Sequence, residues 1–192
     1  MTITRLHAAA LGAALVVAVT AGIARQGDAY SNGPFGHAGS SYGSSYGAAK
    51  GAVFTDGMHI LQNLGERPVR LINVRFEEGE PGLELVGAKV AGLDRAIGSY
   101  QRLPSFPPAV SQPDVVLGPL VDLEGYVIPP GGEYSTKGVE LLLGIRKTVE
   151  GRASRRALLI TYDVDGERAV ARMVGALTVC EAGRNACPDE RG

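Results

Sequence analysis

The stretch that decides the fold is ALLITYDV at residues 157–164, followed by DG at 165–166 and ERAVARMV at 167–174. An Asp-Gly dipeptide between two runs of strand length favours the two-residue type I′ turn of a β-hairpin. Counting outward from this turn places Asp163 opposite Arg168, so opposite charges face each other across the ladder. The sequence therefore predicts an antiparallel hairpin near the end of the chain.

Short apolar runs separated by turn residues also occupy the chain upstream of the hairpin, from about residue 51 onward. No stretch after residue 50 shows a sustained helical period, and residues 94–114 contain four prolines, which favours a long irregular connection. Seven or eight short strands in one domain indicate an all-β sandwich over residues 51–181. The runs of strand length lie at 58–63, 69–76, 83–90, 115–117, 126–128 and 176–180. Eight residues are expected to be largely buried, or to alternate between burial and exposure along each strand: Leu71, Ile72, Val74, Leu141, Leu143, Leu158, Ile160 and Tyr162.

The first 24 residues predict export. Arg5 precedes Ala8–Ala24, a run of 17 residues without a charged side chain. This run fits either a cleaved signal peptide or an uncleaved signal-anchor transmembrane helix. A positive charge before the apolar run keeps the N-terminus inside, so the rest of the chain is expected outside the plasma membrane. The protein is then either a single-pass membrane protein held by this helix or a secreted one.

Residues 25–50 predict a flexible linker, because they are rich in Gly, Ser and Tyr and poor in aliphatic side chains. They include the tandem repeat SSYG at 40–43 and 44–47. Chain of this composition gains little burial in return for becoming ordered. We expect it to separate the N-terminal helix from the folded domain.

Cys180 and Cys187 are the two cysteines of the chain. In an oxidising compartment, two cysteines this close in sequence favour a disulfide that closes a short loop. Two free buried thiols are the alternative. The second cysteine lies in residues 182–192, which are expected to form a short C-terminal tail.

The charge balance argues against nucleic acid as a partner. The chain has 19 Lys and Arg against 20 Asp and Glu, so no bulk attraction to a polyanion is expected. One basic cluster is expected to be a solvated turn with Glu150 among its positive charges. No aromatic residues for base stacking are interleaved with it, which argues against nucleic-acid binding. Its members are Arg146, Lys147, Arg152, Arg155 and Arg156.

The supply of histidine limits the chemistry of the domain. His7 and His37 precede the domain, which leaves His59 alone within it. A Ser/His/Asp triad would have to use this residue, and the chain contains no phosphate-binding or zinc-protease motif. We therefore expect a non-catalytic protein without a cofactor. Two alternatives remain: a carboxylate-dependent hydrolase, and a copper-binding protein using Met58, His59 and Met173, whose donors suit copper.

A set of turn and core positions is spread over most of the domain; its members are Leu61, Asn63, Gly65, Pro68, Val69, Pro129, Pro130, Gly131, Ile160, Thr161 and Tyr162. On these landmarks, residues 127–180 resemble exported bacterial immunoglobulin-like modules, and the chain is more closely similar to exported or membrane-anchored envelope proteins of actinobacteria. The resemblance implies an immunoglobulin-like antiparallel β-sandwich of about 7–8 strands and a location in the cell envelope. It carries over no catalytic residue. The expected role is a module displayed outside the plasma membrane that binds a protein or an envelope component.

Overall fold

The computed structural model describes residues 33–35, 43–92, 103–108, 120–131, 138–183 and 187. These residues form strands and one short 3-10 helix, so the prediction of an all-β fold is confirmed. The expected N-terminal helix at 1–24 and the expected strand at 115–117 lie outside the described residues. Among the residues that are described, no helix has the length and apolar character needed to span a bilayer.

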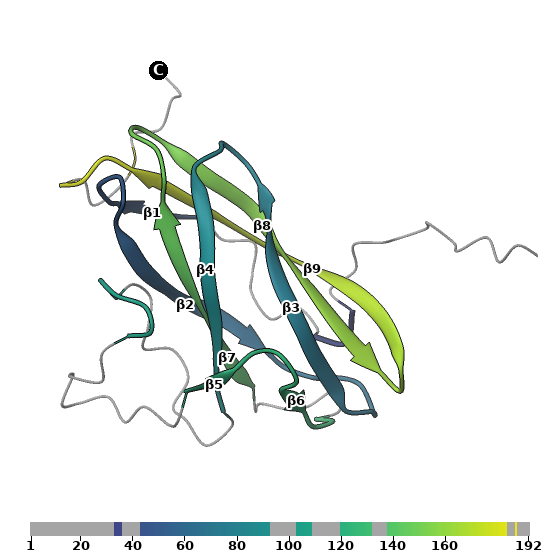
Figure 1. Cartoon of the computed structure of the whole chain (residues 1–192). Helices are drawn as coiled ribbons and strands as arrows, with labels where there is room; N and C mark the ends of the chain where they lie inside the picture. Colours follow the sequence, from purple (N-terminus) through teal and green to yellow (C-terminus); the bar gives the residue numbers. More distant parts are fainter. Residues whose placement is uncertain are drawn as a thin grey trace, which may run out of the picture.

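The described strands form two sheets that pack face to face as a β-sandwich (Figure 1). The first sheet has the order β1-β9-β8-β3-β6 and the second has the order β2-β7-β4-β5. All pairings are antiparallel except that of β1 with β9, which is parallel and differs from the expected antiparallel sandwich. The elements are η1 (Gly33–Phe35), β1 (Gly43–Gly47), β2 (Val53–Leu61), β3 (Val69–Glu78), β4 (Leu83–Ala91), β5 (Leu120–Asp122), β6 (Val127–Ile128), β7 (Val139–Lys147), β8 (Ala153–Val164) and β9 (Glu167–Cys180).

The predicted hairpin is formed by β8 and β9. Asp163 pairs with Arg168 across the ladder, as expected. Asp165 and Gly166 have φ values of 54° and 88°, and positive φ at both central residues is what a type I′ turn requires. β9 continues without a break to Cys180, so the strand expected at 176–180 is the end of this longer strand.

The core between the sheets contains the residues that the apolar pattern predicted, with one exception. Ile72 is half-buried, whereas the other seven are buried. The exception has a local cause, because the pairing of β3 with β8 shifts register between Leu71 and Asn73. The extra residue at such a bulge leaves the in-out alternation of the strand.

Part of the expected linker belongs to the fold, and the prediction of a plain linker is wrong there. Gly43–Gly47 forms β1, which pairs with β9. Phe35 is fully buried and packs edge-on against Tyr162, with ring centroids 5.3 Å apart. Tyr46 packs against the Phe54 ring at 4.9 Å. The prediction rested on the scarcity of aliphatic side chains, but aromatic side chains supply the burial instead.

Residues 103–108 cover the outer surface of the second sheet. The backbone of Leu103 exchanges hydrogen bonds of 2.8 and 3.2 Å with Thr55 of β2. Phe106 lies over the cross-strand pair of Gly87 and Gly144, where an added Cβ would come within 2.7 and 2.3 Å of its ring. This part of the expected irregular connection therefore forms a third layer over the sandwich.

Candidate functional site

The single histidine of the domain lies in a buried ionic cluster between the two sheets. Asp56 and His59 come from β2, and Arg155 comes from β8. The Nη2 atom of Arg155 donates to Asp56 Oδ2 at 2.5 Å and lies 2.8 Å from His59 Nε2. The three residues are 4%, 6% and 2% exposed, respectively, so the cluster is closed to solvent.

Strand irregularities bring the members of this ionic cluster together. The pairing of β2 with β7 shifts register between Asp56 and His59, so both side chains point inward although they are three residues apart. In the pairing of β3 with β8, Arg155 and Ala157 face the adjacent residues Glu78 and Glu77, so β8 has one extra residue at this point. Without this extra residue, Arg155 would share the outward orientation of Ala157.

The charges within the ionic cluster compensate one another. Burial opposes the ionisation of Asp56, but its hydrogen bond with His59 and the charges of His59 and Arg155 hold its pKa well below the usual range. The other terminal nitrogen of Arg155 donates to the carbonyl oxygen of Gly175 at 2.6 Å. The cluster thus joins β2 of the second sheet to β8 and β9 of the first.

The contacts of the His59 Nε2 atom oppose a catalytic role for this nitrogen. Its Nε2 atom lies 3.1 Å from Asp56 Oδ2 and 2.8 Å from Arg155 Nη2. A protonated Nε2 donates to the carboxylate, and an unprotonated one accepts from the guanidinium. In either state this nitrogen is used by a neighbouring side chain in the interior.

The three residues suggested for copper binding are placed as follows. Met58 lies in β2, and its side chain is outside the described part of the structure. Met173 lies in β9 and is 5% exposed. The guanidinium of Arg155 beside His59 Nε2 opposes binding of a cation at that atom. Among the described residues, no group of three or more His, Cys, Asp or Glu side chains could hold a metal ion.

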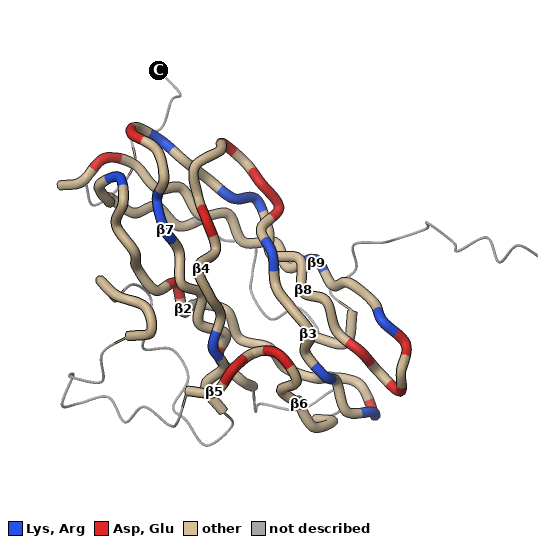
Figure 2. The backbone as a smooth tube through the Cα atoms, viewed as in Figure 1, with Lys and Arg blue, Asp and Glu red and all other residues tan. Residues whose placement is uncertain are grey.

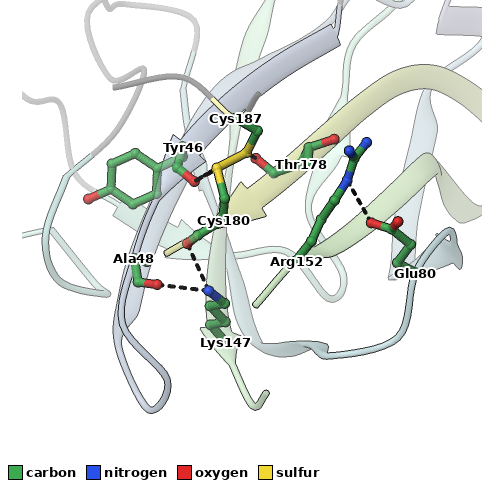
Figure 3. Close-up of a disulfide and its surroundings, with 8 residues drawn as sticks. All are labelled: Tyr46, Ala48, Glu80, Lys147, Arg152, Thr178, Cys180 and Cys187. Carbon is green, nitrogen blue, oxygen red and sulfur yellow. Dashed lines mark hydrogen bonds and ion pairs between the residues drawn. A yellow bond between two sulfur atoms is a disulfide. The ribbon is translucent and has the colours of Figure 1, made fainter. Parts of the chain in front are cut away.

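Cys180 and Cys187 form the predicted disulfide, with Cα atoms 5.6 Å apart. Figure 3 shows Lys147 close to this bond. Lys147 is 1% exposed, and its ammonium group donates to the carbonyl oxygens of Ala48 at 2.9 Å and Cys180 at 2.7 Å. A lysine of β7 in the second sheet is thereby tied to the ends of β1 and β9 in the first.

The basic cluster expected to be a solvated turn is divided between surface and interior. Arg146, Arg152 and Arg156 are exposed, as expected for a solvated position. Arg152 lies in the turn between β7 and β8, but Arg146 and Arg156 lie in the strands themselves, so the prediction of a turn is wrong for them. Arg146 and Arg152 form ion pairs of 2.8 Å with Glu84 and Glu80, respectively. The prediction is also wrong for the two residues described above as buried, Lys147 and Arg155. Strand alternation and the bulge in β8 turn these two side chains inward.

A second group of arginines lies along β3, β8 and β9 of the first sheet, where Figure 2 shows basic positions in blue. Strand pairing and exposure place their side chains on the outer surface of this sheet. Arg172 forms a bidentate pair with Glu77, with distances of 2.6 and 2.9 Å. The hydrogen bond from Arg172 lowers the pKa of Glu77 against the opposing effect of burial. We call this surface the arginine face; its arginines are Arg70, Arg75, Arg156, Arg168 and Arg172.

One end of the arginine face is hollowed into a shallow depression of about 310 Å³. Arg70, Arg168, Asp163 and Glu124 contribute its polar lining, together with backbone and apolar groups. Among the described residues, no histidine, serine or cysteine lines it. Its carboxylates lie beside its arginines. Sequence reasoning missed this surface because its arginines are scattered along the chain and meet only through strand pairing.

The landmark residues of the envelope-protein resemblance occupy structural positions. Leu61 is fully buried. Asn63 is 2% exposed, and its side-chain nitrogen donates to the carbonyl oxygens of Arg67 at 2.7 Å and Ile128 at 3.2 Å. Its side-chain oxygen accepts from the Gly65 backbone at 3.0 Å. These residues organise the loop between β2 and β3.

Comparison with known proteins gives no family: neither a protein-family model nor a curated protein matches the chain.

Proposed function

We propose that the chain is an exported, non-catalytic, immunoglobulin-like module displayed outside the plasma membrane, where it binds a protein or an envelope component. The observation that carries the proposal is the use of His59 in a buried ionic cluster. A general base must reach the proton that it abstracts, and His59 is only 6% exposed. The Cys180–Cys187 disulfide supports an oxidising compartment, where such bonds persist.

The order of the strands supports the immunoglobulin-like part of the proposal. Immunoglobulin domains place strands B, E and D together in one sheet and strands C, F and G together in the other. Here β2, β7 and β4 are neighbours in the second sheet, and β3, β8 and β9 are neighbours in the first. Taking β2 as strand B makes β3, β4, β7, β8 and β9 strands C, D, E, F and G in chain order.

The ionic cluster fits the same correspondence. In antibody domains a disulfide joins strands B and F across the core. In this chain the equivalent strands are β2 and β8, and the ion pair of Asp56 with Arg155 connects them. The disulfide instead closes a loop after β9.

The compartment is tested with a reporter enzyme fused after Gly192 of the full chain. We expect activity outside the cytoplasm alone, together with two thiols that resist alkylation until a reductant is added. Sequencing of the mature N-terminus then distinguishes a cleaved signal peptide from an anchor. A reporter active in the cytoplasm would contradict the proposal.

The non-catalytic role is tested with the tagged full chain in its producing cells. Cross-linking of intact cells, followed by purification through the tag, should yield the same products from the wild-type chain and from His59→Asn. A copper titration of both proteins tests the alternative of a copper-binding function. Stoichiometric copper binding that disappears in His59→Asn and in Met173→Leu would replace this proposal with a copper-binding function.

A further inference from the structure

The arginine face is an array built on three neighbouring strands, with the shallow depression at one end. Strand pairing sets its outward residues in rows across β3, β8 and β9. Two strand spacings separate β3 from β9, which is about 10 Å, and four residues along β9 span about 13 Å. The rows are Arg70, Asp163 and Arg168; Asn73, Thr161 and Val170; Arg75, Leu159 and Arg172; and Glu77, Ala157 and Val174.

The positive charge of this face is only partly compensated. Glu77 is held by Arg172, and Asp163 accepts a hydrogen bond from the turn amide of Gly166 at 2.9 Å. Within the described part of the chain, Arg70, Arg75 and Arg168 are exposed and form no ion pair. Planar guanidinium groups bind carboxylates through two parallel hydrogen bonds. These three groups can each bind an anion, with Asp163 and Glu124 lying beside Arg70 and Arg168 in the depression.

The shape of the face favours an extended polymer over a small anion. A small anion needs several donors that converge on one point, whereas these arginines are spread over about 10 by 13 Å. No aromatic residue occupies any of the four rows, so stacking of exposed bases has no platform. Val170 and Val174 are 36% and 46% exposed on the same face. Their methyl groups can pack against the C–H surfaces of sugar rings, in a polymer whose charged substituents contact the arginines.

From this geometry we infer that the arginine face binds a linear anionic glycan that carries carboxylate groups at regular intervals. The inference rests on the proposed function, since it names the class of envelope component that the module binds. Arg70, Arg75 and Arg168 contact the carboxylates, and the valines pack against the sugar rings. The pair with Glu77 holds Arg172 in place over Ala157, which is fully buried, and Arg156 donates to the backbone carbonyl oxygen of Glu78.

Polygalacturonate is the probe for this inference, and the full chain purified from its producing cells is the protein. Binding is measured by calorimetry at low and at high salt. In Arg70→Gln/Arg75→Gln/Arg168→Gln, loss of three exposed charge contacts should weaken binding about tenfold. The matched control is Lys50→Gln/Lys89→Gln/Arg146→Gln, which removes the same charge from exposed or half-exposed positions off the arginine face. The control should stay within about twofold of wild type.

Several outcomes would overturn the inference. The first is that the wild-type protein does not bind polygalacturonate. The second is that both triple variants lose affinity for polygalacturonate equally. The third is that the wild-type protein binds duplex DNA or phosphatidylglycerol vesicles more tightly than polygalacturonate. Thermal unfolding of each variant identifies any loss that comes from misfolding, and the single variant Arg75→Gln then repeats the test. Failure here leaves the reporter and alkylation results of the proposed function unaffected. A cytoplasmic reporter would refute the proposed function without altering this binding measurement.

Discussion

Arg155 and Arg156 are consecutive residues of β8, but their side chains lie in opposite electrostatic environments. Arg155 is 2% exposed and is fixed by Asp56 and Gly175 within the core. Arg156 is 70% exposed, and its nearest carboxylate oxygen, on Glu77, is 4.0 Å away. The same contrast recurs in β7, where Arg146 is 45% exposed and the next residue, Lys147, is 1% exposed.

The difference shows that a cation has one role inside this sandwich and another outside it. Inside, an unpaired charge would cost several kcal/mol, so each buried cation is held by specific acceptors that join the two sheets. Outside, water screens the charges and ion pairs contribute little to folding. Replacing an exposed arginine is therefore expected to cost the domain little stability.

The comparison is tested most severely by Arg155→Ala. This change leaves Asp56 buried without its guanidinium partner, which should lower the free energy of unfolding by about 3–5 kcal/mol. Urea unfolding followed by circular dichroism measures the loss. The control Arg156→Ala should stay within about 0.5 kcal/mol of wild type. Equal losses of unfolding free energy in the two variants would show that the interior and exterior arginines do not differ in their contribution to stability.

Lys147→Met sharpens the same comparison at the other buried cation. The variant keeps most of the apolar stem but removes the donor to the carbonyl oxygens of Ala48 and Cys180. We expect a loss of about 2 kcal/mol, because buried acceptors lose a charged donor. Arg146→Met should cost less than about 1 kcal/mol, since it removes an exposed pair with Glu84. A neutral Lys147→Met would mean that this lysine does not stabilise the contact between the sheets.

Acid should weaken the interior cluster through Asp56. The folded state holds the pKa of this carboxyl well below its usual range, whereas in the unfolded chain it titrates near the ordinary value of about 3.9. The stabilisation is thus complete above the unfolded pKa and is lost as the pH falls. Between pH 5 and pH 3 we expect about 1 kcal/mol of loss from this group.

The measurement for Asp56 compares unfolding free energies of wild type and Asp56→Asn across this pH range. The difference between the two proteins should shrink toward pH 3, because the variant lacks the titrating group. A constant difference would show that Asp56 does not carry this part of the acid sensitivity.

The smallest effect is expected at the pair of Arg172 with Glu77. A double-mutant cycle with Arg172→Ala and Glu77→Ala should give a coupling of about 0.5 kcal/mol, which declines at high salt. Unfolding at two salt concentrations measures it. A coupling as large as the loss in Arg155→Ala would remove the distinction between interior and exterior charges.

The sequence predicts those parts of the fold that depend on local pattern. The turn at Asp165-Gly166 sets the register of the final hairpin, and the strand periods identify most of the core. The inward position of Arg155 depends on a one-residue bulge of β8 opposite β3, which reverses the alternation that the sequence would suggest. The arginine face depends on strands distant in sequence, so no local pattern could reveal it. The role of Phe35 was missed because a single aromatic residue carries no periodicity.

The parallel pairing of β1 with β9 has a mechanical consequence for a protein pulled from its N-terminal side. The ladder joins Gly43 to Ala176 and continues in register to Gly47 and Cys180. Suppose that the first sheet is held at its outer surface and that force is applied to Gly43 along the strand. The force then pulls β1 along its own axis, so that β1 slides past β9. The hydrogen bonds run across the strands, so they are loaded together in shear. They cannot open one after another, as they would if the strand were peeled sideways.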